Sequence, residues 1–386
     1  MPELVINVSN IISPLCYTIL RIEPYTACPY RCIYCYSRWY IRGGSEVVAP
    51  RRKAVDMFER VARHIYKKGV KPIPFRLSTL VDPFPSHEEL NRVSERVLSI
   101  ARKYMYPLII NTKSSAVLKV EGIRKGLEEL LDKGLALLQL SLSTLDDSKS
   151  KALEPLAPSP SKRLLVLREF GLRGFPVAVR LSPYIPLYSP TNEEEVEFML
   201  GLLKDAGVRH IIVESLRIER EVVEELIKRL GIQELSFEGY GIREVVGLKP
   251  LVRVSEGLRV SAYSTLHKHS VKMGIGFATC KEGLFRFHTT DDCCGAYMLK
   301  NYVLRVTLWD FYRVGVGVLK QKEDVKAYVN SVCRRFSRIC GEDLGLYPRT
   351  ISKPMKYHEK KLLKVLEKQE ILKLIAPDFA KSHDAL

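Results

Sequence analysis

The chain has 386 residues, 46% of them hydrophobic, which is enough for two domains or for one large domain with an extension. No apolar run reaches the roughly 20 residues needed to cross a bilayer, and residues 1–13 lack the basic and apolar regions of a signal peptide. We therefore expect a cytoplasmic protein with no membrane partner. The net charge of +17 would attract phosphate backbones, although heat-adapted proteins also carry basic surfaces.

The first two thirds of the chain alternate between short apolar segments and amphipathic helical segments. Residues 5–22 are apolar and β-branched, which predicts one or two strands. Further strands are expected at 75–79, 108–111, 136–141, 177–181 and 210–213. Six strand–helix units predict an α/β fold with a parallel sheet, in the form of a partial TIM-like barrel. Functional side chains of such folds lie at the carboxyl ends of the strands.

Three cysteines, Cys28, Cys32 and Cys35, lie close together in the loop after the first predicted strand. Cysteine thiolates are the usual ligands of a [4Fe-4S] cluster, and three of them would leave one iron open for a small molecule. Structural zinc is the alternative, but zinc usually takes four ligands as two pairs. The chain has no second Cys-x2-Cys pair, so the spacing favours a cluster.

Polar or charged residues follow the later predicted strands, at the rim where we expect chemistry. They are Asp82, Asn111, Lys113, Ser141, Arg180, Glu214 and Arg217. Each one taken alone could be an ordinary loop residue.

The cysteine spacing, with Tyr34 before the last cysteine, resembles the radical S-adenosylmethionine (radical SAM) superfamily. Residues 78–83, 111–114, 141–146 and 153–160 resemble its spore photoproduct lyase-like branch, and the similarity covers roughly residues 15–220. The resemblance implies a core of the radical SAM type, a partial (β/α)6 barrel, at residues 15–230. A strand segment at 1–14 would precede it, and a basic, cysteine-containing α+β extension at 231–386 would follow.

The resemblance also implies the cofactors. Cys28, Cys32 and Cys35 would hold a [4Fe-4S] cluster, and S-adenosylmethionine (SAM) would bind the open iron. One electron from a donor such as ferredoxin or flavodoxin would then cleave SAM reductively, and the resulting 5′-deoxyadenosyl radical would abstract a hydrogen atom.

Four further residues are implied to bind SAM. Lys113 would bind the methionine carboxylate, with Arg180 as a second candidate for the same task. Tyr34 would lie against the adenine, and Ser141 would bond to the amino-acid or ribose portion.

One position departs from the family pattern. Photoproduct lyases of the spore type place a hydrogen-donating cysteine where this chain has Thr79. An O–H bond is far stronger than an S–H bond, so we do not expect thymine-dimer repair by that route. Tyr36 matches a tyrosine of the family that is implicated in radical relay, but it could equally be a packing aromatic.

A second cysteine group, Cys280, Cys293 and Cys294, lies in the last third of the chain. Three interpretations compete for it: a second iron–sulfur cluster or other metal site, a substrate-facing redox or hydrogen-donating thiol, or buried inert thiols. Cys333 and Cys340 follow later in the chain and belong to the same group. Without a secretory signal, we expect reduced thiols throughout.

The charge and the resemblance together predict repair or modification of a nucleic acid. Basic and aromatic residues near the carboxyl end fit this partner, namely Arg334, Arg335, Phe336, Arg338, Tyr347, Arg349, Lys353, Lys356 and Tyr357. A radical SAM maturase that modifies a peptide or protein with an auxiliary metal site is one alternative. A non-catalytic iron–sulfur protein that binds nucleic acid or transfers electrons is another.

Overall fold

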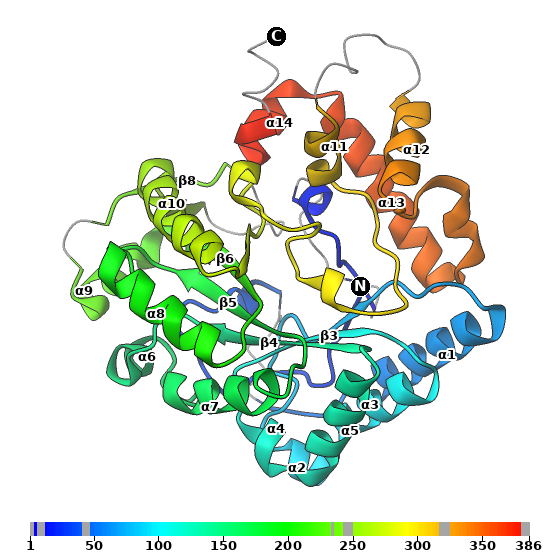
Figure 1. Cartoon of the computed structure of the whole chain (residues 1–386), viewed down its shortest axis with the longest axis horizontal. Coiled ribbons are helices and arrows are strands. Elements are labelled where there is room, and N and C mark those ends of the chain that lie inside the picture. The colour runs from blue at the N-terminus through cyan, green and yellow to red at the C-terminus, as the bar shows by residue number, and fades with distance from the viewer. Residues whose placement is uncertain are drawn as a thin grey trace.

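A sheet of seven parallel strands organises the chain (Figure 1). The computed structural model describes residues 4–5, 12–40, 47–232, 235–241, 250–315 and 325–379. Neighbouring strands pair in the order β1-β2-β3-β4-β5-β6-β10. Their bounds are β1 Arg21–Ile22, β2 Phe75–Leu77, β3 Leu108–Thr112, β4 Ala136–Leu142, β5 Val177–Tyr184, β6 His210–Ser215 and β10 Gly276–Thr279. Within these ranges β1 and β10 do not pair with each other, so the sheet forms an open partial barrel.

Helices cover the convex face of this sheet (Figure 1). The long ones are α1 Arg52–Lys68, α3 Val93–Lys103, α5 Glu121–Asp132, α7 Pro160–Gly171, α8 Glu193–Asp205 and α10 Glu256–Lys272. Shorter helices lie between them at α2 Glu88–Asn91, α4 Ala116–Lys119, α6 Asp147–Leu153 and α9 Val223–Leu230. Helix α1 shows why the packing works: Val55, Phe58 and Ile65 recur at helical spacing and are buried against the sheet.

The strands pack an apolar outer side under the helices, and their inner side combines polar residues with a smaller apolar cluster. Leu138, Val179 and Ile211 belong to the core under the helices, whereas Gln139 and Arg180, one residue along, make polar contacts on the inner side. Side chains of a strand point to opposite faces in turn, so one face can bury a core while the other carries chemistry.

The predicted α/β partial barrel is confirmed, with one strand more than the sequence indicated. β10 pairs with β6 from Gly276↔His210 to Thr279↔Val213. The four residues of β10 follow the irregular segment after residue 230. That segment interrupts the alternation of strands and helices, so the sequence pattern did not reveal this strand. The division of the chain at residue 230 stays a prediction, and the part after it supplies this edge strand of the core sheet.

The predicted amino-terminal strand segment, residues 1–14, is described only in part. Residues 1–3 and 6–11 lie outside the described ranges. Val5 forms an isolated antiparallel bridge with Leu20, and Ser13–Leu15 is a 3-10 turn.

A small antiparallel sheet and a helical group complete the fold. The small sheet has the order β7-β9-β8, with bounds β7 Arg217–Glu219, β8 Phe237–Gly239 and β9 Leu251–Val254. The helical group is α11 Leu308–Val314, α12 Val325–Arg335, α13 Arg349–Leu366 and α14 Gln369–Ile375. These helices share a second core with Ile12, Leu15 and Trp39, so the two ends of the chain pack together (Figure 1).

Cys333 and Cys340 form a disulfide between the end of α12 and the segment before α13. The expectation of reduced thiols throughout is therefore wrong for this pair. The sequence spacing does not reveal the pairing, because it depends on how the chain reverses after α12. The remaining described cysteines are free.

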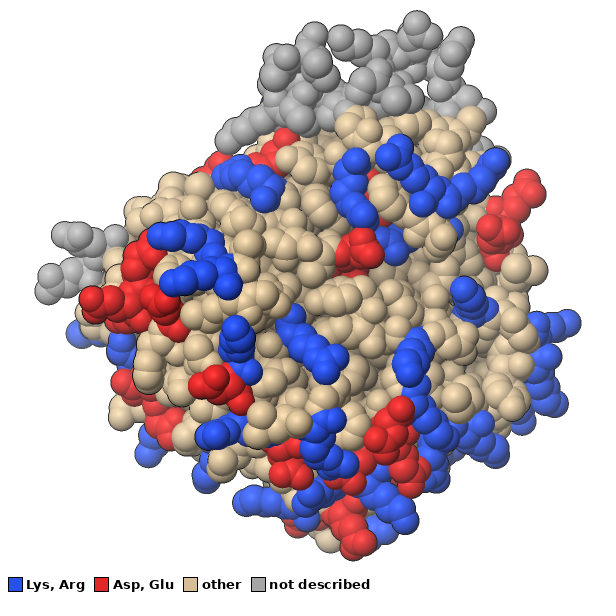
Figure 2. Space-filling model, viewed as in Figure 1, with Lys and Arg blue, Asp and Glu red and all other residues tan. Residues whose placement is uncertain are grey.

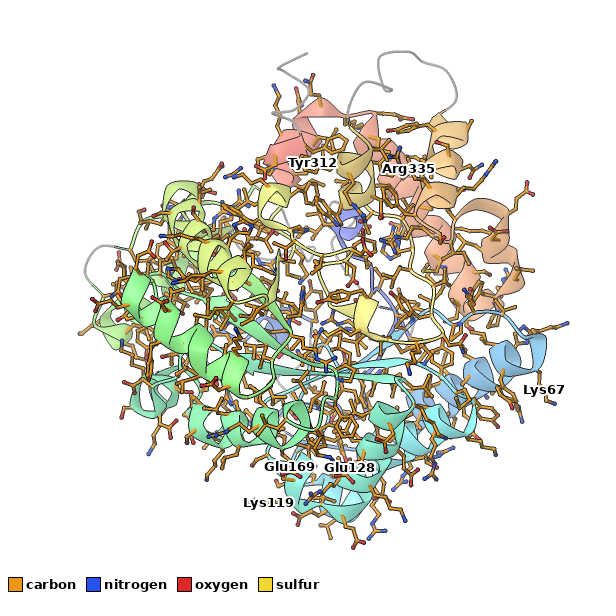
Figure 3. The ribbon with its side chains drawn as sticks, viewed as in Figure 1. Lys67, Lys119, Glu128, Glu169, Tyr312 and Arg335 are labelled. Carbon is orange, nitrogen blue, oxygen red and sulfur yellow. A yellow bond between two sulfur atoms is a disulfide. The ribbon has the colours of Figure 1, made fainter. Side chains whose placement is uncertain are left out.

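Basic residues cover parts of the surface. Figure 2 shows Lys and Arg gathered over α1 at the right of the view, and Figure 3 shows Lys67 extending outward there. Elsewhere acidic partners balance them: Glu128 of α5 and Glu169 of α7 lie close together (Figure 3), and Arg124 contacts both, at 3.2 and 2.7 Å. Among the helices described, none is both long and apolar enough to pass through a membrane.

Candidate active site

A cavity opens at the carboxyl ends of the sheet strands, with the cysteine loop on one side. The residues predicted for the site that line it are Cys28, Cys32, Cys35, Tyr34, Tyr36, Lys113, Ser141, Arg180 and Cys280. They come from the loop after β1, from the ends of β3, β4 and β10, and from the middle of β5. Parallel strands bring these sequence-distant residues to one edge. Cys293 and Cys294 are buried close to Cys280 instead.

The cysteine loop is fixed by backbone contacts. Cys35 N donates to Cys32 O at 3.1 Å, and Ile33 N donates to Leu153 O at 3.0 Å. Burial raises the pKa of Cys28 and of Cys32 to about 12, so both are neutral thiols when no cation is near. Iron would supply the positive charge that favours their thiolate forms.

Cys28, Cys32 and Cys35 line one cavity and could serve as ligands of one shared group. Across the described ranges, no three Cys, His, Asp or Glu side chains lie close enough to hold one metal ion. A [4Fe-4S] cluster is itself several ångströms wide and takes a thiolate at each of several corners, so its ligands stand farther apart. The set Cys28, Cys32 and Cys35 around one cavity fits such a cluster, with one corner left for another ligand.

Lys113 is held beside the loop by a buried network. Its Nζ donates to Ser141 Oγ at 3.1 Å, lies 3.9 Å from Glu154 Oε1 and lies 5.7 Å from the centre of the Tyr34 ring. Tyr34 Oη donates to the same Glu154 carboxylate, whose other oxygen is paired with Arg163. Burial opposes charge on Lys113, but Glu154 raises the pKa of its ammonium, which therefore stays protonated.

Thr79 and Asp82 take part in structural hydrogen bonds. Thr79 Oγ1 donates to Glu23 Oε1 at 2.5 Å and accepts from Arg21 Nη1 at 3.2 Å. Asp82 accepts from Thr112 Oγ1 at 2.8 Å and from Lys113 N at 2.7 Å, which fixes the end of β3. Tyr36 Oη donates to Thr79 O, so the tyrosine hydroxyl lies beside Thr79.

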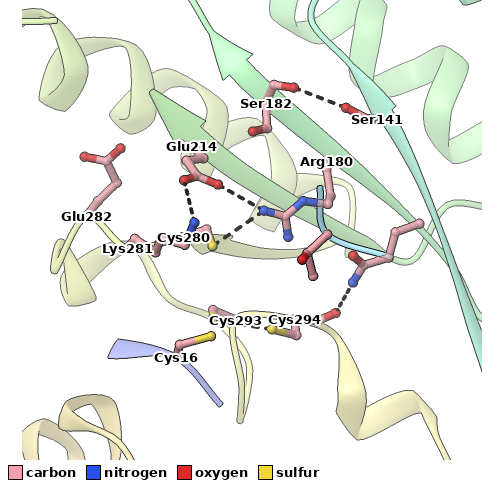
Figure 4. Close-up of polar contacts among 12 residues, drawn as sticks. Cys16, Ser141, Arg180, Ser182, Glu214, Cys280, Lys281, Glu282, Cys293 and Cys294 are labelled. Carbon is pink, nitrogen blue, oxygen red and sulfur yellow. Dashed lines mark hydrogen bonds and ion pairs between the residues drawn. The ribbon is translucent and has the colours of Figure 1, made fainter. Parts of the chain in front are cut away.

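A second charged group lies on the β6 and β10 side of the cavity (Figure 4). Glu214 binds Arg180 Nη2 at 3.1 Å and Lys281 Nζ at 3.2 Å, and it also pairs with Arg217. Burial alone would raise the pKa of Glu214, but Lys281, Arg217 and Arg180 together lower it to about 2. Glu214 is therefore a carboxylate surrounded by three cations.

The later cysteines form a buried thiol group next to these charges (Figure 4). Arg180 Nη2 donates to Cys280 Sγ at 3.6 Å, and Cys293 Sγ lies 3.8 Å from Cys294 Sγ. A hydrogen bond from Cys293 lowers the pKa of Cys280 to about 6, with Arg180 and Lys281 adding to the effect, and the pKa of Cys293 is raised well above its usual value.

Several buried polar atoms of the cavity lining lack partners. Asn111 Oδ1, Arg180 Nη1 and Arg21 Nε make no hydrogen bond to any described part of the chain. Native proteins rarely leave such atoms unsatisfied, so they point to a polar ligand in the cavity. Asn111 offers an acceptor, Lys113 and Arg180 offer cations, and Tyr34 offers a ring, and this set of groups fits SAM.

The sequence analysis missed four residues of the site. Glu154 directly follows α6, Arg163 lies in α7, Glu23 follows β1, and Lys281 follows the strand that was not predicted. A charged residue directly after Cys280 was the one available signal for Lys281. The pairing of Glu154 with Arg163 depends on how α6 and α7 turn back on β4.

Comparisons with known proteins place these features in context. No family model matches the chain. An uncharacterized protein of Acidianus two-tailed virus is 28% identical over 226 residues, which cover 55% of this chain and 71% of that protein. An uncharacterized protein of Methanocaldococcus jannaschii is 27% identical over 189 residues, which cover 47% of this chain and 65% of that protein.

Solved structures of spore photoproduct lyase share the architecture. The complex with dinucleoside spore photoproduct has a TM-score of 0.52 at 14% identity, and the match covers 69% of this chain and 78% of that one. A variant with bound AdoMet and the same dinucleoside has a TM-score of 0.51 at 14% identity, covering 68% and 76%. The chain therefore has the partial-barrel fold of the radical SAM type, as found in spore photoproduct lyase.

Proposed function

We propose that the chain is a radical SAM enzyme that cleaves SAM reductively and acts on a nucleic acid. One observation carries the proposal: Cys28, Cys32 and Cys35 line the same cavity as Lys113, at the carboxyl ends of a parallel partial barrel. In this arrangement a [4Fe-4S] cluster would bind on one side of the cavity, and SAM would bind the open iron of that cluster. When bound, the two would supply a 5′-deoxyadenosyl radical for hydrogen abstraction.

The residues around Lys113 would orient SAM. The Lys113 ammonium would bind the methionine carboxylate, and Ser141, which already bonds to Lys113, would complete that end. The Tyr34 hydroxyl is tied to Glu154, which fixes the ring as a wall for the adenine. Asn111 Oδ1 would accept a hydrogen bond from an amino group of the cofactor.

The Cys280–Cys293 pair is the proposed hydrogen donor in place of Thr79. Cys280 ionises more readily than Cys293, so Cys293 carries the proton of the pair, and transfer of that proton to Cys280, which lines the cavity, would present the hydrogen atom to the substrate. A carbon radical on the substrate would take that hydrogen atom, leaving a sulfur-centred radical. One electron from a ferredoxin or flavodoxin and one proton from water would restore the pair. Tyr36, whose ring lies 5.7 Å from Lys281 Nζ, would relay the radical.

A nucleic acid is the preferred substrate class. The net charge of +17 and exposed basic residues on α1 and α13, such as Lys67, Lys353 and Lys356, support attraction to phosphates. Spore photoproduct lyase, which shares the fold, has been solved with a dinucleoside photoproduct. The peptide or protein maturase is the competing enzyme class, and a non-catalytic iron–sulfur protein is the competing non-enzyme.

Anaerobic reconstitution with iron and sulfide tests the proposal. The reduced protein should contain about four irons per chain and should form 5′-deoxyadenosine from SAM; about eight irons would assign a second cluster to the later cysteines. A full iron content without 5′-deoxyadenosine would favour the non-catalytic alternative. Binding to DNA or RNA should weaken steeply with salt, and no binding at low salt would remove the nucleic acid from the proposal.

A further inference from the structure

We propose that Arg180, Arg217 and Lys281 form a subsite inside the cavity for an anionic group of the substrate, a phosphate of the nucleic acid. The inference rests on the proposed function and adds to it the part of the substrate that enters the barrel. All three residues line the cavity, and they lie on the side of β6 and β10, away from the Lys113 network.

Three cations gather around one carboxylate at this place. Three cations share Glu214, and their side chains are largely buried, with 7% exposed for Arg180, 9% for Arg217 and 21% for Lys281. The neighbouring Cys280 adds a second negative charge when it ionises, and its pKa of about 6 allows that at neutral pH. An anion that enters the cavity would meet these cations largely shielded from water, where attraction between opposite charges is strong.

Arg180 also has an unused donor. Its Nη2 serves both Glu214 and Cys280, whereas Nη1 is buried without a hydrogen-bond partner in the ranges that the structure describes. A guanidinium group matches the oxygens of a phosphate in pairs, and charge-assisted bonds of this kind are about twice as strong as neutral ones. The ammonium of Lys281, 3.2 Å from Glu214, would face the same anion.

The position of Arg180 separates this subsite from the expected SAM carboxylate. Ser141 and Arg180 are paired residues of β4 and β5, but their polar ends point to different partners. Ser141 accepts from Lys113 and donates to Ser182 O, whereas the Arg180 guanidinium is directed to Glu214 and Cys280 (Figure 4). A carboxylate at Lys113 and a phosphate at Arg180 can therefore be bound at once.

Two dinucleotides that differ in one substituent of the linkage, a charged oxygen or a neutral methyl group, test the inference. The probes are thymidylyl-thymidine with its natural phosphodiester and the same compound with a neutral methylphosphonate linkage. Calorimetric titration of the reconstituted, SAM-loaded protein should give tighter binding of the charged compound. Arg180→Gln and Lys281→Gln should each raise the Kd of the charged dinucleotide about tenfold and leave the Kd of the neutral one within about twofold. Lys272→Gln, which removes a surface charge on α10, is the matched control and should change neither Kd.

Glu214→Gln gives a prediction of opposite sign. Removing the internal counter-ion should lower the Kd of the charged dinucleotide, because the carboxylate then no longer competes with the phosphate for the three cations. A raised Kd in this variant would contradict the subsite. If Arg180→Gln does not fold, as judged by circular dichroism, the more exposed Lys281→Gln carries the test.

Three further results would overturn the inference: equal Kd values of the two dinucleotides, no measurable binding of the charged one, or an Arg180→Gln variant that loses SAM affinity instead. The last result would assign Arg180 to the SAM carboxylate. The proposed function fails separately, by absence of 5′-deoxyadenosine from wild-type protein. The two proposals can therefore be judged independently.

Discussion

Arg163 and Glu154 form an ion pair in which neither side chain has any exposed surface. Glu154 also accepts from Tyr34, so this pair ties the cysteine loop to β4. Glu154→Gln would leave the Arg163 guanidinium buried without its counter-ion. We expect the free energy of unfolding of the cluster-free protein to fall by about 3 kcal/mol, as measured by urea denaturation.

A surface pair provides the control for this variant. Glu197→Gln breaks the contact with Lys272, in which both side chains are at least half exposed, and it should leave the urea midpoint close to that of the wild type. Equal midpoints for the two variants would show that the buried pair does not stabilise the loop.

The three loop cysteines should be indispensable for iron. Cys32→Ala should lower the iron content of the reconstituted protein from about four per chain to below about one, with loss of the visible absorption of the cluster. Cys16→Ala is the matched control, because Cys16 lines the same cavity and bonds to Thr18 O. It should keep the full iron content. A loss of iron in this control would indicate that the cluster binds at the side of the cavity where Cys16 lies.

The sequence predicted the features that depend on one short segment of the chain. Apolar runs predicted the six strands from β1 to β6, since a buried parallel strand needs them, and the spacing of Cys28, Cys32 and Cys35 predicted a shared site. The charge group around Glu214 could not be assembled in the same way. It joins Arg180, Arg217 and Lys281 from β5, β7 and the end of β10, and β10 is too short to be recognised by its pattern.

Cys280 should react as a thiolate at neutral pH. Its pKa of about 6 arises mainly from the hydrogen bond of Cys293, with Arg180 and Lys281 adding to it. The rate of Cys280 alkylation by iodoacetamide, followed by mass spectrometry on the reconstituted protein, should rise with a midpoint near pH 6, whereas an ordinary cysteine has its midpoint near pH 8.5. Cys293→Ala should move the midpoint upward by about one unit or more. An unchanged midpoint in that variant would exclude the Cys280–Cys293 hydrogen bond.

The buried His210 should make the fold sensitive to acid. Burial lowers the pKa of His210 to about 4, and nearby Arg180 adds to the effect, while its Nε2 lies 3.3 Å from Cys293 O. Between about pH 6.5 and 4 the unfolded chain binds a proton at this residue and the folded chain does not, so stability falls as the pH falls through that window. The slope from this one histidine is about 1.4 kcal/mol per pH unit.

His210→Gln isolates that contribution. The variant keeps a polar side chain near Cys293 O but cannot titrate, so its free energy of unfolding should change less between pH 6.5 and 4.5 than that of the wild type. The difference should approach 2–3 kcal/mol, about two pH units multiplied by that slope. The buried His288, whose pKa burial lowers to about 3, remains in both proteins and sets the common background. Parallel pH profiles for the two proteins would mean that His210 is already protonated in the fold, which would require an acceptor for both ring nitrogens.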